Sequence, residues 1–337
     1  MTAYLLRRLI AMPLLLLGVV TMAFLLGNVV KGDPLASILN ERQMNNPEVV
    51  AAAKARWGLD QPLPERYLVY IGNLAQGDLG TSFRTKRPVM EDLLVRLPAT
   101  LELVLSAMLF GVVVGTTIGV IAAHWRNGPV DHGARLVALI GSSVPVFWSG
   151  LIALYIFAVE LPWLPGAGRL DPAYPAPEAV TGFYTIDAAL AGNWEVFLDA
   201  LTHLVLPSVI LGWAVLGIIS RMVRASMLDV LQQDFIVTAR AKGAGTLRVL
   251  LRHALRNAMV PALTIIGFTF AYLITGAILT ETVFSWPGIG SYAVDAARSL
   301  DHPAIIGVTI IGALGFLLAN LLTDIAYVFA NPRIRLS

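Results

Sequence analysis

Long apolar runs alternate with polar connections along the chain. Six runs are long enough to cross a bilayer, because a membrane-spanning helix needs about 20 mostly apolar residues. These predicted spans cover residues 9–30, 99–123, 136–159, 201–220, 263–283 and 304–330. The first run is longer than the apolar region of a signal peptide and no small-x-small cleavage site follows it, so we expect a retained anchor. The pattern predicts an all-α integral membrane protein with six transmembrane helices.

Basic residues mark one side of these spans. The N-terminal segment, the connections after the second and fourth spans, and the C-terminal tail are rich in arginine, and six spans place all four on one side. Short cytoplasmic loops carry the excess of Lys and Arg, so both termini are expected in the cytoplasm. Segment 31–98 is then external, and helices starting near Pro47 and Glu65 are expected to form a small cap there.

Composition supports a membrane protein and narrows its chemistry. The 337 residues are 57% hydrophobic and only 14% charged, with a mean hydropathy of +0.72, whereas soluble domains have about 25% charged residues. The net charge of +2 gives no indication of a nucleic-acid partner. The absence of cysteine excludes disulfides, thiolate metal sites and cysteine nucleophiles. No Gly-x-x-x-x-Gly-Lys-Ser/Thr motif is present, so any ATP must be bound by another chain.

Two features within the spans leave alternatives open. Gly111, Gly115 and Gly119 form a smooth ridge on the second span, suited either to packing inside the chain or to an interface with another subunit. Pro145 removes a backbone hydrogen bond in the third span and is expected to kink it. The kink would serve either a moving pathway or packing alone.

The cytoplasmic connection 224–257 is unusually ordered for a loop. A first helix is expected to end at Lys242, with Gly243 in the left-handed conformation, and Thr246 is expected to cap the next. The second helix is amphipathic and places Arg248 and Arg252 on one basic stripe. This segment is either an interfacial helix that meets lipid phosphate or a docking element for a cytoplasmic partner. The fixed turn favours docking, because a lipid anchor does not need one.

Several motifs then resemble a known family. TARAKG followed by HALRNAMVP is similar to the cytoplasmic loop of permeases in binding-protein-dependent ABC importers, and in particular to the first permease of the dipeptide/oligopeptide/nickel group. LPATLELVLSA, SVPVFW, ETVFSWPGIG, NPRIRL and RWGLDQPLPERYLVYIGNLAQGDLGTSF also match that group. The resemblance covers nearly the whole chain and is weakest over 160–200. The wider superfamily has Glu-Ala-Ala before the glycine, and here Val237, Thr238 and Ala239 stand in its place.

The resemblance implies a fold and a docking site. The fold would be the type I transmembrane domain of ABC importers over 1–337, with 31–98 as a periplasmic cap that meets a substrate-binding protein or only covers helix ends. Segment 224–257 would hold the coupling helix that fits a groove of a cytoplasmic ATPase. The expected contact residues are Ala239, Arg240, Ala241, Lys242, Gly243, Ala244, Gly245, Thr246, Leu247, Arg248 and Arg252.

The resemblance also implies partners and a mechanism. A second, homologous permease, one or two ATPase subunits that hold ATP and magnesium, an extracytoplasmic binding protein and the bilayer would surround this chain, which itself would carry no catalytic, cofactor or metal site. It would sit in the bacterial inner membrane and form half of an alternating-access path. The expected path residues are Glu281, Phe284, Trp286, Tyr272 and Thr275. For Trp286 the alternative is an interfacial aromatic belt.

The cargo and the transporter class have alternatives. The importer would carry di- or oligopeptides, or else glutathione or nickel chelates. A secondary transporter would be expected to show coupling charges within the membrane and inverted repeats with broken helices, and neither stands out. An intramembrane enzyme is disfavoured because His-Glu-x-x-His and Gly-x-Ser-x-Gly are absent and the five histidines are scattered.

Overall fold

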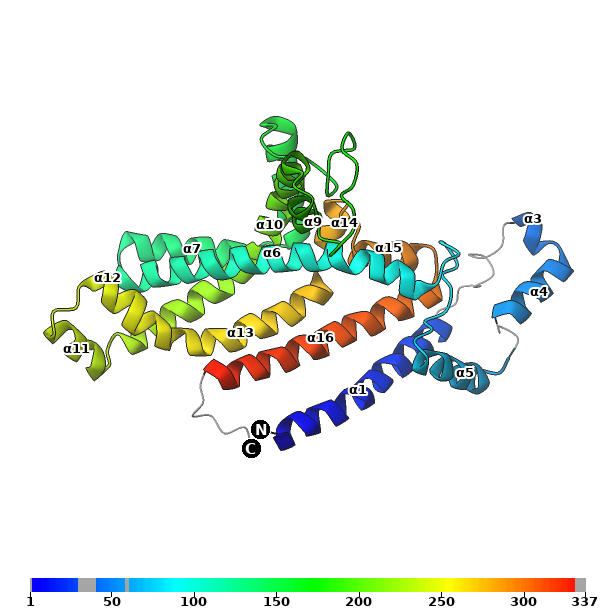
Figure 1. Cartoon of the computed structure of the whole chain (residues 1–337), viewed down its shortest axis with the longest axis horizontal. Coiled ribbons are helices and arrows are strands. Elements are labelled where there is room, and N and C mark those ends of the chain that lie inside the picture. The colour runs from blue at the N-terminus through cyan, green and yellow to red at the C-terminus, as the bar shows by residue number, and fades with distance from the viewer. Residues whose placement is uncertain (1, 30–40, 58–60, 331–337) are drawn as a thin grey trace.

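The computed structural model describes residues 2–29, 41–57 and 61–330, apart from some side chains near these limits and those of 275 and 276. Figure 1 shows that the described regular elements are helical. They are α1 (Thr2–Val29), α3 (Glu41–Met44), α4 (Pro47–Trp57), α5 (Leu63–Ala75), α6 (Val89–His124), α7 (Pro129–Ser143), α8 (Val146–Leu154), the π-helix η1 (Tyr155–Glu160), α9 (Tyr184–Leu190), α10 (Trp194–Val230), α11 (Asp234–Ala241), α12 (Thr246–Arg248), the π-helix η2 (Val249–Ala254), α13 (Leu255–Gly276), α14 (Ile278–Val283), α15 (Ile289–Arg298) and α16 (His302–Ala330).

The predicted spans correspond to helices, although not one to one. Within the described residues, four helical runs are long and apolar enough to cross a membrane: α6, α10, the run from α12 into α13, and α16. A fifth arises if α7, α8 and η1 count as one broken span. The described apolar part of α1 is shorter, at Ile10–Leu25, so the sixth span stays a prediction.

The third predicted span is broken rather than kinked. Its two halves, Pro129–Ser143 and Val146–Glu160, meet at 103°. Val144 has extended backbone angles (φ −83°, ψ 131°), as expected for a residue that precedes a proline. Pro145, also non-helical, precedes α8. The expectation of one kinked helix over 136–159 was wrong, because the residue before the proline is held out of the helical region.

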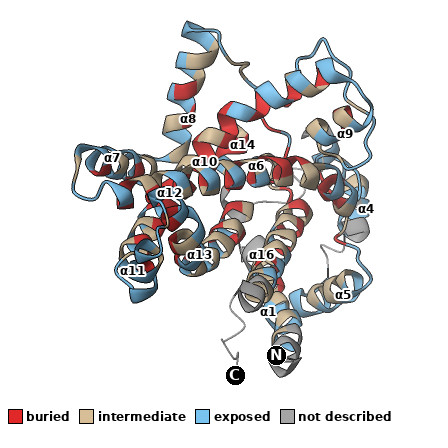
Figure 2. Cartoon of the chain, turned by 60° about the vertical axis from the view of Figure 1, so that its left-hand side comes forward, coloured by how far each residue is buried: buried red, intermediate tan, exposed pale blue. Residues whose placement is uncertain are grey.

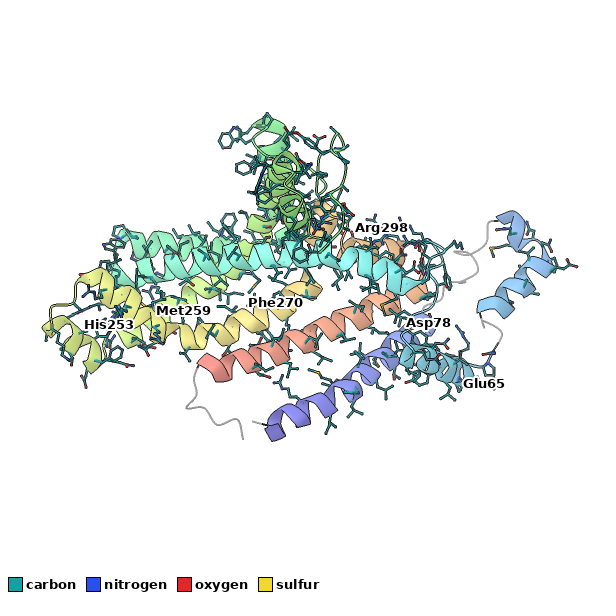
Figure 3. All side chains as sticks on the ribbon, viewed as in Figure 1. Glu65, Asp78, His253, Met259, Phe270 and Arg298 are labelled. Carbon is teal, nitrogen blue, oxygen red and sulfur yellow. The ribbon has the colours of Figure 1, made fainter. Side chains whose placement is uncertain are left out.

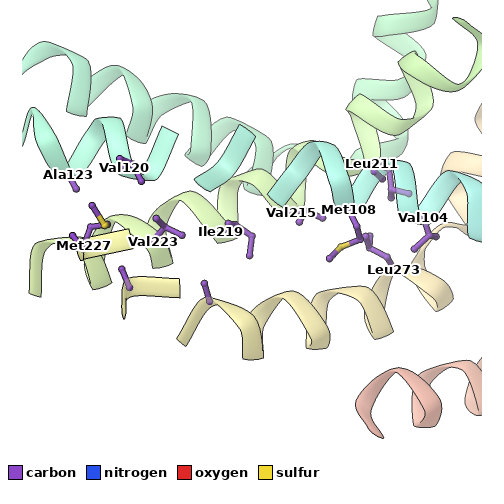
Figure 4. Packing of buried hydrophobic residues seen from close by; sticks show 14 of the residues in the cluster. Val104, Met108, Val120, Ala123, Leu211, Val215, Ile219, Val223, Met227 and Leu273 are labelled. Carbon is purple, nitrogen blue, oxygen red and sulfur yellow. The ribbon is translucent and has the colours of Figure 1, made fainter. Parts of the chain in front are cut away.

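The glycine ridge packs inside the chain. A Cβ atom at Gly111 would lie 2.6 Å from Cβ of Val215, and one at Gly119 would lie 2.8 Å from Cβ of Val223. Figure 4 shows Val215, Ile219 and Val223 of α10 facing this side of the core, with α13 beneath them. Of the two alternatives left open by the sequence, the structure has the internal one: the ridge lets α6 and α10 approach closely.

The described residues of segment 31–98 contact both α1 and the C-terminal helices. Phe24 of α1 stacks edge-on against Tyr67 of α5, with ring centroids 5.4 Å apart. The turn after α5 is held by Asp301, which accepts hydrogen bonds from Ser82 Oγ (2.5 Å) and the Arg84 backbone N–H (3.1 Å). Residues 79–93 therefore pack against α15 and the start of α16, at the end of the molecule opposite α11 and α12 (Figure 1).

Candidate functional site

The turn between α11 and α12 is fixed by backbone hydrogen bonds. Gly243 has φ +82°, the left-handed conformation expected from the sequence. Its N–H donates to the carbonyl of Arg240 (2.9 Å), and the N–H of Ala244 donates to the carbonyl of Ala239 (3.1 Å). This pair of bonds is the Schellman motif, which satisfies carbonyl groups at the end of α11. The turn is therefore a defined structure and not a loose linker.

The second helix of this loop begins differently from the expectation. Gly245, not Thr246, is the residue before the first helical position, so the predicted Thr246 cap is displaced by one. Three residues later the backbone changes to the π-helix η2 before α13 continues. Figure 3 labels His253, Met259 and Phe270 along this continuous run. The loop is thus joined to the long helix α13 without a flexible break.

The loop has a buried face and an exposed face. Ile236, Val249, Leu250 and Ala254 are buried in the main core cluster, beside the C-terminal ends of α6 and α10. The apolar side of the amphipathic helix that starts at Thr246 faces the core only in part, because Leu247 is 70% exposed. The π-helical turn rotates the residues around it relative to a regular α-helix. The exposed face carries Phe235, Val237, Arg240, Lys242, Leu247, Arg248, Leu251 and Arg252.

The basic residues of this face are unpaired within the described part of the chain. Arg240, Lys242, Arg248 and Arg252 form no salt bridge with a described acidic side chain. By contrast, Arg224 at the start of this segment makes a bidentate pair with Asp131, with both contacts at 2.7 Å. The exposed face therefore combines apolar side chains with free cations on a rigid backbone, a combination suited to a protein partner.

The Asp131–Arg224 pair was missed by the sequence reasoning, which used the arginine only to assign orientation. Asp131 is buried in the first turn of α7, where it also accepts a hydrogen bond from the N–H of Asn127 (2.9 Å). Through this pair the start of α7 is fixed to the end of α10, where the loop departs. A carboxylate in the first turn of a helix that starts with Pro129 was the available signal.

At the other end of α13, three expected path residues lie inside the chain. Glu281 is fully buried and accepts hydrogen bonds from Thr100 Oγ1 (2.6 Å) and the Ser291 N–H (2.9 Å). A Cβ atom at Gly288 would lie 2.4 Å from both carboxylate oxygens, so only glycine fits there. The carboxylate of Glu281 therefore links α14 to α6 and α15 through hydrogen bonds. We call Glu281, Thr100 and Ser291 the Glu281 knot.

Trp286 and Phe284 belong to the same buried region. The indole N–H of Trp286 donates to the carbonyl of Ala99 (2.8 Å), and its side chain is 1% exposed, so it is not part of an interfacial belt. Phe284 packs beside Ala153, Leu206 and Ile210. None of these side chains is open to a passing solute in this conformation.

The two remaining path residues lie on α13. Tyr272 is 63% exposed, one helical turn from the exposed Phe268. The side chain of Thr275 lies outside the described residues. Of the five expected path residues, Tyr272 is therefore the one whose described side chain reaches the surface of this chain.

A buried ion pair beside the knot was also missed. Arg169 lies in the 160–200 connection, and its guanidinium contacts Glu102 of α6 at 2.5 Å and donates to the carbonyl of Gly182 (2.9 Å). Glu102 also accepts from the N–H of Thr185 (2.9 Å). The sequence contains no local signal for a partner of Glu102 that lies 67 residues away along the chain.

These geometries describe an all-helical chain with helices long and apolar enough to cross a membrane and an exposed basic face on a fixed turn at one end, the class of a helical integral membrane protein. No group of three metal-ligating side chains occurs among the described residues. Family models match nearly the whole sequence: the binding-protein-dependent transport system inner membrane component over 115–336, and its N-terminal membrane component over 1–104. The chain belongs to this family of inner membrane components, and ATP hydrolysis is not its activity.

The sequences of curated proteins match this chain along nearly their whole length. The chain is 46% identical to the di/tripeptide transport system permease protein DppB of Pseudomonas aeruginosa, over 99% of both chains. It is 42% identical to the dipeptide transport system permease protein DppB of Escherichia coli, again over 99% of both. It is 37% identical to the glutathione transport system permease protein GsiC of Pectobacterium atrosepticum, over 99% of both.

Proposed function

We propose that this chain is a permease subunit of an ATP-driven, binding-protein-dependent importer of di- or oligopeptides. The names of the relatives that are 46% and 42% identical over full length support peptide cargo. Glutathione, itself a tripeptide, is the alternative that the 37% identical relative supports. Nickel chelates rest on the sequence resemblance alone. Membership of the binding-protein-dependent family argues against an ion-coupled secondary transporter.

The observation that carries the ATPase-docking role is the exposed face of α11, α12 and the turn between them. It holds unpaired cations beside exposed apolar side chains, and Gly243 fixes the angle between its two helices. Residues 239–248 and Arg252 are the proposed contact with a cytoplasmic ATPase. The loop and both termini are then cytoplasmic, the orientation that the arginine distribution favours.

The continuous helical run explains how such a contact would act on the path. Helix α12, η2 and α13 extend from Thr246 to Gly276, and α14 follows after one residue. Met259 on this run contacts Thr116 of α6 through its sulfur (4.0 Å). The run ends at the Glu281 knot with Thr100 and Ser291. Movement of the loop by closing ATPases would therefore reach the external end of α6 and α15.

The remaining surfaces complete the proposed mechanism. The external cap, residues 31–98, would receive the peptide-loaded binding protein. A second, homologous permease would supply the other half of the path, with Tyr272 of this chain facing that path. ATP and magnesium would be held by one or two partner ATPase subunits. The path would open outward when the ATPases close and return inward after hydrolysis.

The experiment that tests this function is the double charge reversal Arg248→Glu/Arg252→Glu. In the whole transporter, reconstituted in proteoliposomes with its binding protein and a labelled dipeptide, we expect ATP hydrolysis to lose its dependence on peptide and uptake to fall to background. Arg126→Glu, an exposed arginine on another connection of the same predicted side, is the matched control and should leave both intact. Normal uptake in the double variant would refute the docking role.

A further inference from the structure

The break between α7 and α8 lies at the depth of the hydrocarbon core of the membrane, where lipid cannot satisfy polar groups. Helix α7 starts at the level of the Asp131–Arg224 pair and has 15 residues, so it rises about 22 Å at 1.5 Å per residue. The hydrocarbon core of a bilayer is about 30 Å thick. Val144 and Pro145 therefore leave the helical conformation within that core, and Pro145 and the adjacent Ser143 are exposed on this chain.

Irregular backbone at this depth has strict requirements. Without water, unpaired backbone groups in hydrocarbon are costly, so such segments are found only where protein or a water-filled cavity covers them. A charge lies beside the break as well: the exposed Arg221 donates from Nη1 to Ser142 Oγ (3.2 Å). Charged side chains within spans face other protein or water. This side of the chain is thus unsuited to lipid.

The helices after the break project from the rest of the molecule. We call α8 and η1, residues 146–160, the arm. Figure 2 shows α8 standing clear of the other helices except at its base. Its packed side is small, with Gly150 and Ala153 buried near Phe284 and Ile210. Large apolar side chains on the remaining sides are exposed: Phe147, Trp148, Leu151, Ile152, Tyr155, Ile156 and Val159.

The arm does not serve as a complete span. It has 15 residues, fewer than the roughly 20 needed to cross the bilayer, and it turns by 103° from α7. Its exposed surface is rich in aromatic residues, which are enriched in protein–protein interfaces. A projecting apolar helix that starts at an uncovered break is suited to insertion against another membrane subunit.

We propose that the arm and the break before it are the surface by which this chain docks on the second permease of the importer. This inference rests on the proposed function, which supplies that permease. A second membrane subunit would cover the irregular backbone at Val144 and Pro145, the Arg221 guanidinium and the apolar arm together. Lipid would be a suitable neighbour for the apolar arm alone.

The natural chain has no cysteine, so single-cysteine variants give clean crosslinks. Leu151→Cys places a thiol on the arm, where the leucine is 53% exposed. The matched control is Leu322→Cys on α16, where the leucine is 63% exposed. A cysteine-free second permease with scattered single cysteines is co-expressed, and the intact transporter in native membranes is treated with a short bis-maleimide. Mass spectrometry identifies the crosslinked chains.

We expect crosslinks from position 151 to the second permease to exceed those from position 322 several-fold. Crosslinks that favour position 322, or crosslinks from 151 to another copy of this chain, would overturn the inference. So would the absence of any crosslink when position 151 reacts fully with a lipid-soluble maleimide. In each case, co-purification of the second permease with uncrosslinked transporter shows that the proposed function stands, and its absence shows that the function itself has failed.

Discussion

Arg169 and Glu102 lie 2.5 Å apart inside the protein, although 67 residues separate them along the chain. Both side chains are almost fully buried, and the Arg169 guanidinium also lies 3.7 Å from the ring centroid of Tyr184. The pair fixes the irregular 160–200 connection to α6, beside Trp286 and the Glu281 knot. This connection is therefore part of the same rigid unit as the N-terminal half of α6 and α14.

Removal of the arginine tests that rigidity. We expect Arg169→Met to destabilise the protein by about 3–5 kcal/mol, because it leaves the Glu102 carboxylate buried without its counter-charge. Arg84→Met is the control, since Arg84 makes an equally short pair with Asp295 at an exposed site, where such pairs contribute about 0–1 kcal/mol. Thermal unfolding of the purified proteins in detergent measures both. Equal losses of stability in the two variants would show that the buried Arg169 pair contributes no more than the exposed Arg84 pair.

The turn at Gly243 gives a second prediction. Gly243→Ala forces a side chain into the left-handed region, at a cost of about 1–2 kcal/mol. Gly245→Ala is matched, because both positions have open space around them but Gly245 has φ −66°. Hydrogen exchange of the Ala244 amide, which is bonded to Ala239 in the native turn, should speed up in the first variant only. Comparable exchange in the two variants would contradict the fixed turn.

The glycine ridge between α6 and α10 gives a third prediction. We expect Gly111→Ala to cost about 1–3 kcal/mol through overpacking, since its Cβ atom would lie 2.8 Å from the carbonyl oxygen of Gly212. Gly133→Ala in α7 meets nothing within 4 Å and should be neutral or stabilising. Unfolding temperatures in detergent separate the two. If both variants behave alike, α6 and α10 are not packed through the ridge.

A fourth prediction concerns acid stability outside the spans. Burial of the Asp187 carboxyl would raise its pKa, but hydrogen bonds from the Thr181 hydroxyl and from the N–H groups of Thr181, Gly182 and Val180 lower that pKa below its usual value. A lowered folded-state pKa contributes stability above the unfolded-state pKa of about 3.9, and this contribution is lost as the pH falls through the lowered value.

The measurement is the unfolding temperature of the wild type and of Asp187→Asn between pH 7 and pH 3. We expect the difference between them to be constant near neutrality and to shrink below about pH 4, because the unfolded-state carboxyl titrates there. A difference that stays constant across the whole range would show that the pKa of Asp187 is not lowered in the folded protein.

The sequence predicted the features that depend on local chain chemistry. The length of the apolar runs located the spanning helices. The end of α11 requires a residue in the left-handed conformation, and this requirement indicated Gly243. The sequence did not predict the 103° break, because a proline in an apolar run is compatible with either a kink or a full break. The direction that α8 takes after the break depends on residues far along the chain, since Gly150 and Ala153 pack near Phe284 and Ile210.

The site was predicted less completely than the fold. The Arg169–Glu102 and Arg224–Asp131 pairs join residues 67 and 93 positions apart, and no local pattern indicates such contacts. The burial of Glu281 and Trp286 likewise depends on the knot with Thr100 and Ala99. Leu247, one of the residues predicted to contact a partner, is exposed, and the change to a π-helical turn two residues later was not predicted.

Co-purification tests the central claim most directly. The tagged chain is extracted in mild detergent from its own host, and the accompanying proteins are identified by mass spectrometry. We predict an ATPase and a second permease, with the ATPase lost when Arg248 and Arg252 are reversed to glutamate and retained in Arg126→Glu. A stable chain that purifies alone, or an ATPase that remains with the reversed variant, would contradict the assignment of this loop as the docking site.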